Sequence, residues 1–165
     1  VNGQFWTAAV GPEETLELLV ERIDAADDTL QIVGGTPATG LDLQNASSRV
    51  VDGLEAALER GVDVKLLVTP AIVTTLPADT IETYDARLSD YDNYAVRTHE
   101  TIEGTFTLID GGEVCLEVPN PLNPQQAFAM IDLKDRSFVA DVRAVFEPRW
   151  ENADPLTVPV GARSD

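Results

Sequence analysis

A carboxylate and a hydroxyl lie two residues apart in an extended segment, and an aspartate follows them in a tight turn. Glu103 and Thr105 precede Asp110, and the alternation of a strand puts the first two side chains on one face. Together they offer hydrogen bonds to the hydroxyls of a polyol. They include no nucleophile with a general acid beside it, so hydrolysis is not expected. Two interpretations stay open: a ligand pocket, or a hairpin in which Asp110 only makes the turn.

Two other segments are candidates for effector contacts. The loop Gly34, Gly35 and Thr36 follows a predicted strand, on the side of an α/β sheet where ligands usually bind. It lacks the third glycine of a dinucleotide fingerprint, so no nucleotide cofactor is expected. Arg97 lies near the end of a later strand, where it either clamps an anionic effector or pairs with one of the many carboxylates.

The sequence offers little for a metal or a redox group. His99 is the one histidine and has no second histidine with which to build a zinc site, so a solvated loop residue is expected. Cys115 is the one cysteine, and strand alternation puts it on the face of Glu113 and Glu117. Neighbouring carboxylates disfavour a thiolate, so Cys115 is predicted to be a packed structural thiol. No cofactor and no metal are expected.

These candidates are positioned by alternating helices and strands. A hairpin is predicted over residues 104–118, with its turn at residues 110–112, because aspartate and glycine tolerate the positive φ of a tight turn. Before it, apolar spacing predicts helices over 12–27 and 47–60 and strands over 28–33 and 62–68. Helices that alternate with strands across short connections are typical of a parallel sheet covered by helices.

The second half of the chain adds further elements. A helix is predicted after Pro77, within residues 70–92, followed by strands over 94–97 and 127–132. A last helix around residues 138–146 should end or kink at Pro148. Trp6 and Trp150 are expected to be core or interface anchors rather than stacking platforms for a ligand. One domain over residues 5–155 is predicted, with a flexible tail at 156–165.

Charge is the second strong signal. The chain has 29 acidic and 11 basic residues, a formal net charge of -18, and only Lys65 and Lys134 as lysines. Self-repulsion of this size is screened at about 1 M salt, which favours a protein of a salt-accumulating haloarchaeal cytoplasm over an acidic mesophilic one. A surface this acidic releases no counterions from a phosphate backbone and gains no binding energy from it. We therefore do not expect this segment to bind nucleic acid or an anionic membrane. A run of 18 apolar residues is absent, which argues against a membrane span.

Several segments together resemble the effector domain of the TrmB-like family of archaeal transcription regulators. The matching segments are Phe5-Trp6 with residues 11–16, residues 25–30 entering the first strand, residues 56–64 entering the second, and the hairpin at residues 108–110. Pro12 stands where the family's opening motif has an arginine. The family's winged helix-turn-helix segment has no counterpart in this sequence, so a DNA-binding domain is not expected here.

The resemblance implies a phospholipase D-like α/β fold: a mixed, largely parallel sheet with a hairpin, flanked by helices. In phospholipase D-like enzymes a histidine and a lysine two residues apart precede an aspartate five residues after the lysine. Counting back from Asp110 puts Thr105 at the lysine position and Glu103 at the histidine position. The resemblance therefore implies a domain that is not an enzyme.

By the same resemblance, the chain is expected to be an effector-sensing and dimerisation domain of a haloarchaeal TrmB-like regulator. The expected effector is a sugar or a small metabolite, bound where two hairpin faces meet in a homodimer, and DNA is contacted only through a segment absent from this chain. A partner-docking module with no small ligand and a divergent phosphodiesterase are the alternatives.

Overall fold

The structure is a computed structural model that describes residues 6–34, 43–75, 78–100, 102 and 104–156. Some positions singled out in the sequence, Phe5, Gly35, Thr36 and Glu103, lie outside the described residues, as do residues 157–165 of the predicted tail. Leu156, the first tail residue, still donates a backbone hydrogen bond to the Val96 carbonyl. No helix in the described ranges is long and apolar enough to cross a membrane.

Eight strands and five helices make up the described part of the chain. The strands are β1 Trp6–Val10, β2 Thr29–Gly34, β3 Asp63–Val68, β4 Tyr94–Thr98, β5 Thr105–Ile109, β6 Glu113–Asn120, β7 Asn123–Leu133 and β8 Asp154–Pro155. The helices are α1 Pro12–Ala25, α2 Leu43–Glu59, α3 Pro70–Thr75, α4 Ala78–Leu88 and α5 Arg136–Glu151. The predicted helices and strands, including the hairpin of β5 and β6, are confirmed, while β1, β8 and the short helix α3 were not anticipated.

The strands form one sheet in the order β1-β7-β6-β5-β2-β3-β4-β8. In its described part, only the β2–β3 and β3–β4 pairs are parallel, and the remaining neighbours run antiparallel. The prediction of a largely parallel sheet is therefore wrong. Short turns join β5 to β6 and β6 to β7, and a short turn forces antiparallel pairing because a parallel partner needs a crossover of a dozen or more residues.

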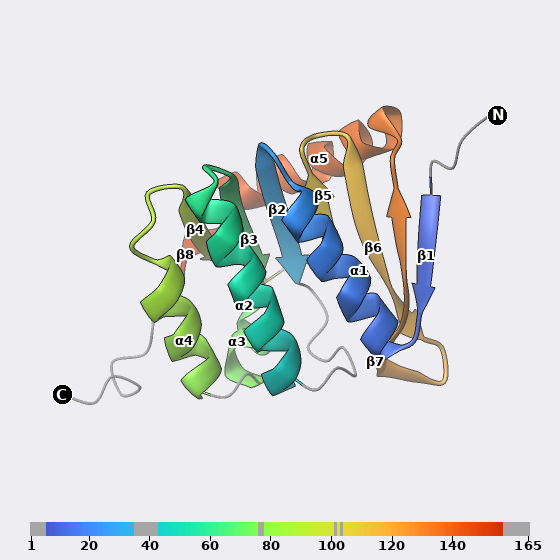
Figure 1. Ribbon diagram of the computed structural model, residues 1–165, viewed down its shortest axis with the longest axis horizontal. Coiled ribbons are helices and arrows are strands. Elements are labelled where there is room, and N and C mark those ends of the chain that lie inside the picture. Colours follow the sequence, from blue (N-terminus) through green and yellow to red (C-terminus); the bar gives the residue numbers. More distant parts are fainter. Residues whose placement is uncertain (1–5, 35–42, 76–77, 101, 103, 157–165) are drawn as a thin grey trace.

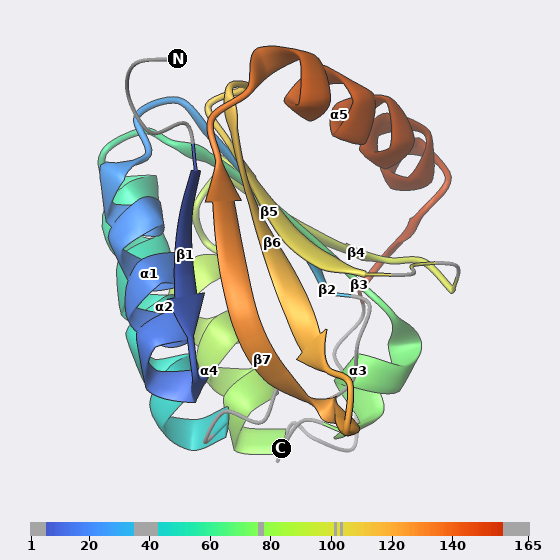
Figure 2. The ribbon, with the colours of Figure 1, turned by 90° about the vertical axis from the view of Figure 1, so that its right-hand side faces the viewer.

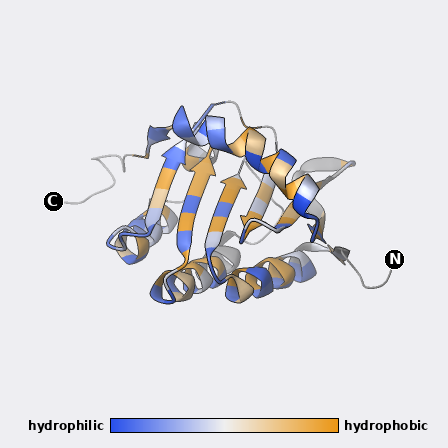
Figure 3. Cartoon of the chain, turned by 90° about the horizontal axis from the view of Figure 1, so that it is seen from above, coloured by the Kyte–Doolittle hydropathy of each residue, from blue (hydrophilic) through white to orange (hydrophobic). Residues whose placement is uncertain are grey.

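The sheet lies between two helical layers. Helices α1, α2 and α4 cover one face and α5 crosses the other, as Figures 1 and 2 show. Each interface has its own apolar core: one contains Ile23, Leu30 and Leu54, and the other contains Leu67, Leu108 and Phe146. In Figure 3 the strands between the helical layers are largely hydrophobic, as expected for a sheet buried on both faces.

Local sequence explains where helix α1 begins. Gly11 adopts φ 96°, a conformation that favours glycine, and Pro12 occupies the first turn, where a missing N–H costs nothing. Glu13 and Glu14 follow in that turn, and Arg22 lies in the last turn, so both ends complement the helix dipole.

Helix α5 contradicts one expectation. Asp135 caps its start, with a carboxylate that accepts a hydrogen bond from the Phe138 amide, and the helix runs from Arg136 through Pro148 to Glu151. Of the two predicted effects of Pro148, an end of the helix is wrong, and a kink stays a prediction. Pro148 lies in the last turn, and buried Trp150, stacked on Phe146, anchors the turn that follows it. Trp150 is thereby confirmed as a core residue.

Candidate functional site

The edge of the sheet where the parallel strands end carries two of the predicted site residues. Gly34, the last residue of β2, lies directly opposite Thr105, the first residue of β5. Alternation along β5 puts Thr105 on the same face as Thr107, which is buried against the α1 and α2 layer. The structure therefore brings Gly34 and Thr105 together, and the other members of the predicted loop lie outside the described residues.

Asp110 lies at the other end of β5, in the hairpin turn, with a φ of 54°. Its carboxylate accepts hydrogen bonds from three consecutive backbone amides, those of Asp27 at 3.1 Å, Asp28 at 2.7 Å and Thr29 at 3.0 Å. It lies five residues along the chain from Thr105, a distance of roughly 16 Å at ordinary strand rise. The structure does not bring Asp110 and Thr105 together; Asp110 instead joins the hairpin to the start of β2.

Arg97 lies on the face of the sheet opposite Thr105. Its guanidinium stacks over the Trp150 ring at 4.5 Å, and its Nη1 donates a hydrogen bond to the Trp150 carbonyl oxygen at 2.8 Å. Lys65 Nζ lies 5.5 Å from the centre of the same ring. Cations over an indole face are attracted by its quadrupole. These contacts give Arg97 a structural role in holding the end of α5.

A buried polar cluster lies between α1 and the strands β6 and β7. Arg22 Nη1 lies 3.2 Å from Glu113 Oε2, and the two side chains are only 17% and 14% exposed. Asp132, which is 2% exposed, lies on the same face of the neighbouring strand β7, opposite Cys115 and therefore diagonally across from Glu113. The Cys115 thiol donates to Asp132 Oδ1 at 3.4 Å. We call these four residues the α1 polar cluster.

Burial controls the titration of this face of β6. Burial, followed by the neighbouring Asp132, raises the pKa of Glu113 to about 7. Burial alone raises the pKa of Glu117 to about 7. The predicted packed thiol is confirmed, since Cys115 is buried, and burial together with the same Asp132 raises the pKa of this thiol.

Sequence reasoning placed Glu113, Cys115 and Glu117 on one strand face but did not assemble the α1 polar cluster. Two signals were available: Arg22 is the one cation of an acidic helix, and Asp132 interrupts an apolar strand. Neither signal identifies the partner, because Arg22 and Glu113 are 91 residues apart in sequence. Among the described residues, no group of three or more histidine, cysteine or acidic side chains could hold a metal ion.

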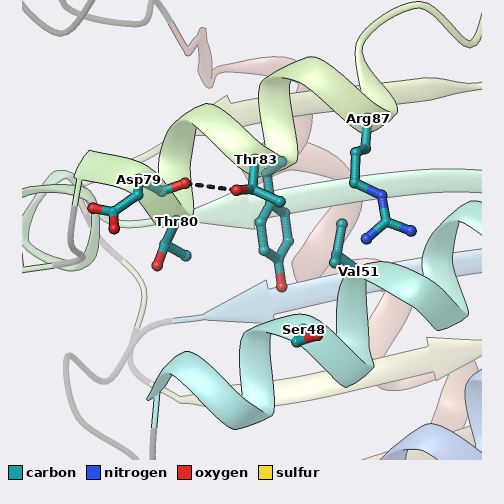
Figure 4. A pocket seen from close by; sticks show the side chains of 7 residues that line it. Ser48, Val51, Asp79, Thr80, Thr83 and Arg87 are labelled. Atoms are coloured by element: carbon teal, nitrogen blue, oxygen red, sulfur yellow. Dashed lines mark hydrogen bonds between the residues drawn. The ribbon is translucent and has the colours of Figure 1, made fainter.

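A groove of about 370 Å³ separates helices α2 and α4, and Figure 4 shows the side chains that line it. They are Ser48, Val51, Asp79, Thr80, Thr83, Tyr84 and Arg87. At one end, Arg87 bridges the helices through Asp52 at 2.8 Å and Glu55 at 2.6 Å. The Thr83 hydroxyl donates to the Asp79 carbonyl at 2.8 Å. Hydroxyls beside an aromatic ring and an apolar floor can bind a neutral polyhydroxylated molecule.

A second cavity, of about 120 Å³, lies between α5 and the sheet. Its lining is apolar apart from one arginine and consists of Val33, Leu67, Ile102, Gly104, Phe106, Val145, Phe146 and Arg149. Its size is close to that of a single small apolar molecule. No side chain pair in it combines a nucleophile with a base.

Solved structures share this fold at low sequence identity. TrmBL2, described as an archaeal chromatin protein with a novel mode of DNA binding, matches with a TM-score of 0.68 and 19% identity over 94% of this chain. The phospholipase D family member Nuc from Salmonella typhimurium matches with a TM-score of 0.65 and 14% identity over 92% of this chain and 97% of its own. NucT from Helicobacter pylori gives a TM-score of 0.69 and 14% identity over 92% of this chain and 98% of its own.

These likenesses establish a phospholipase D-like fold. The chain spans 55% of the length of TrmBL2. No curated protein sequence matches the chain. Residues 1–156 match a family described as a domain of unknown function, DUF7436.

Proposed function

The chain belongs to the DUF7436 family, and we propose that it is a non-enzymatic effector-sensing and dimerisation domain of a TrmB-like archaeal transcription regulator. The fold shared with TrmBL2 supports the assignment to a regulator. The acidic composition supports a salt-adapted host. Contact with DNA would belong to another segment, because a net charge of -18 repels phosphates.

One observation carries the non-enzymatic part of this proposal. At the catalytic positions of the phospholipase D pattern the chain has Glu103 and Thr105 in place of histidine and lysine. The retained aspartate, Asp110, has its carboxylate bound to three backbone amides at the far end of β5. A threonine hydroxyl cannot neutralise a phosphate as a lysine does, and a glutamate in place of the histidine removes the family's nucleophile.

We therefore expect no turnover of bis(p-nitrophenyl) phosphate or phosphatidylcholine by the purified domain in 2 M KCl. A phospholipase D enzyme assayed in parallel serves as the positive control. Any trace activity should persist unchanged in Thr105→Val, which would identify a contaminant. Activity that is abolished by Thr105→Val would contradict the proposal and favour a divergent phosphodiesterase.

The groove between α2 and α4 is the effector site that the described residues support best. Asp79, Asp52 and Glu55 surround it with negative charge, and Arg87 is already paired with the last two. An anionic metabolite would be repelled there, whereas a neutral saccharide would use the hydroxyls of Ser48 and Thr80. The sheet edge where Gly34 meets Thr105 is a second candidate, because it carries the strand that holds the catalytic pair in the enzymes.

The proposal predicts a dimer that binds a neutral saccharide. Light scattering in 2 M KCl should give twice the 17.8 kDa mass of the chain. Calorimetric titration with glucose and maltose should detect binding that Thr80→Val weakens about fivefold, the usual effect of losing one hydrogen bond. Thr74→Val, at an exposed position of α3, is the matched control and should bind normally.

The outcomes separate the alternatives. A dimer that binds neither sugar would favour a docking module with no small ligand. Binding that Thr80→Val leaves intact but Thr105→Val weakens would move the site to the sheet edge. A strict monomer in 2 M KCl would argue against the dimerisation part of the proposal.

A further inference from the structure

The α1 polar cluster contains more acid than base. Its two carboxyl groups, Glu113 and Asp132, are opposed by one guanidinium, that of Arg22. Two buried carboxylates beside one guanidinium repel each other unless one of them holds a proton. With one proton bound the cluster is neutral, and without it a net negative charge is buried between helix and sheet.

The contacts bring the two carboxyl groups together. Asp132 lies opposite Cys115 on β7 and accepts a hydrogen bond from its thiol, while Glu113 lies two residues before Cys115 on the same face of β6. Glu113 Oε2 accepts a hydrogen bond from Arg22 at 3.2 Å. A carboxylic acid both donates and accepts, so a single proton can be held between the two groups, and the charge of Arg22 is then balanced by the one negative charge that remains.

We propose that Glu113 and Asp132 share one proton that keeps helix α1 docked on β6 and β7, and that α1 loosens from the sheet when this proton is lost. Loss of the proton leaves two like charges side by side in a site largely removed from water, where repulsion is less screened than at the surface. Undocking α1 restores water to both carboxylates. Proton binding by Glu113 and Asp132 is therefore coupled to the position of helix α1. This helix also packs on α2 and β1.

The charged groups facing Glu113 from each packed element are few. Helix α1 supplies Arg22, with Glu21 beside it, and β7 supplies Asp132. On β6 itself Cys115 stays protonated, and the facing position of β5 is the apolar Ile109. On β1, Thr7 lies opposite Asp132 and does not titrate. Within these elements, Arg22 is the cation that acts on the pair.

The direction of the effect follows from linkage. The pKa of Glu113 is raised from 4.5 to about 7 by burial and by Asp132, so the docked state binds a proton that the undocked state has already released. The stabilisation of docking is complete below pH 4.5 and is lost progressively until the pH passes about 7. Docking of α1 should therefore weaken as the pH rises, whereas paired carboxylates usually make a folded protein less stable as the pH falls.

Hydrogen exchange at controlled pH tests this inference. Exchange of α1 and α2 amides is measured by mass spectrometry from pH 5 to pH 8 in 2 M KCl and corrected for intrinsic rates. All variants carry Glu117→Gln, so that the second raised pKa does not contribute. In this background, protection of α1 should fall up to tenfold per pH unit between about pH 5 and pH 7 and then level off, because one proton is linked. Protection of α2 should change less.

Substitutions decide whether the pair is responsible. Glu113→Gln and Asp132→Asn should both make the protection of α1 independent of pH, whereas Asp24→Asn, an exposed carboxylate on the same helix, should keep the slope. An unchanged slope in Glu113→Gln or in Asp132→Asn would overturn the proposal, as would equal slopes for α1 and α2. If neither variant folds, a carbon-13 titration of the Glu113 carboxyl decides: a midpoint below pH 5 would refute the shared proton.

Discussion

Replacing Asp110 by alanine is expected to lower the free energy of unfolding by about 2–4 kcal/mol, although the residue is exposed and far from any candidate pocket. The carboxylate binds the amides of Asp27, Asp28 and Thr29, and these bonds connect the α1–β2 junction to the β5–β6 turn. Hydrogen bonds to a charged acceptor contribute more than neutral ones. Urea unfolding in 2 M KCl measures the loss.

Two further variants separate the hydrogen bonds from the backbone conformation. Asp110 has a positive φ, which costs alanine roughly 1 kcal/mol and glycine nothing. Asp110→Gly should therefore retain most of the loss, and Asp110→Asn, which keeps one acceptor oxygen, should lose less. Asp141→Ala, an exposed carboxylate on α5, is the matched control. A loss below 0.5 kcal/mol in Asp110→Gly would show that the hydrogen bonds contribute little.

Raising KCl from 0.1 M to 3 M is expected to raise the melting temperature by roughly 10 °C or more, since each kcal/mol is worth about 2–4 °C in a domain of this size. The chain has a net charge of -18, and α1 alone carries five acidic residues and one arginine. Screening shortens from about 10 Å at 0.1 M to about 3 Å at 1 M, which removes most repulsion between exposed carboxylates. Circular dichroism at fixed pH measures the change.

A charge-reduced variant distinguishes screening from general salting-out. Glu17→Gln and Asp24→Asn together remove two negative charges from the exposed face of α1 without touching the acidic first turn. The variant should melt higher than the parent at 0.1 M KCl and gain less from added salt, whereas the two should converge at 3 M. A melting temperature that does not change with salt would count against adaptation to multimolar salt.

Much of the secondary structure could be predicted because its causes are local. The apolar stripes of α1 and α2 and the Asp110-Gly111-Gly112 turn need only neighbouring residues. The low helix propensity of Pro148 is also a local signal, and it predicted that the helix could end there. The helix continues because the packing of Trp150 on Phe146 and Arg97 holds the turn beyond Pro148.

The direction of the strands could not be predicted from local pattern. Alternating helices and strands indicate parallel pairing, and β2, β3 and β4 obey this rule. The remaining strands pair through hairpins or across the chain, as β1 does with β7, and nothing within β1 itself specifies a partner more than a hundred residues away.

The sequence by itself determined that this is an acidic α/β chain with a hairpin at residues 110–112 and without the catalytic histidine and lysine of phospholipase D, because these are properties of residue types and short spacings. Only the tertiary structure decided what the remaining polar groups do. Asp110 binds amides more than 80 residues earlier, and Glu113 meets Arg22 across 91 residues. Hydrogen bonds and burial act through space, so the roles of these carboxylates exist only once helix α1 is packed on the sheet.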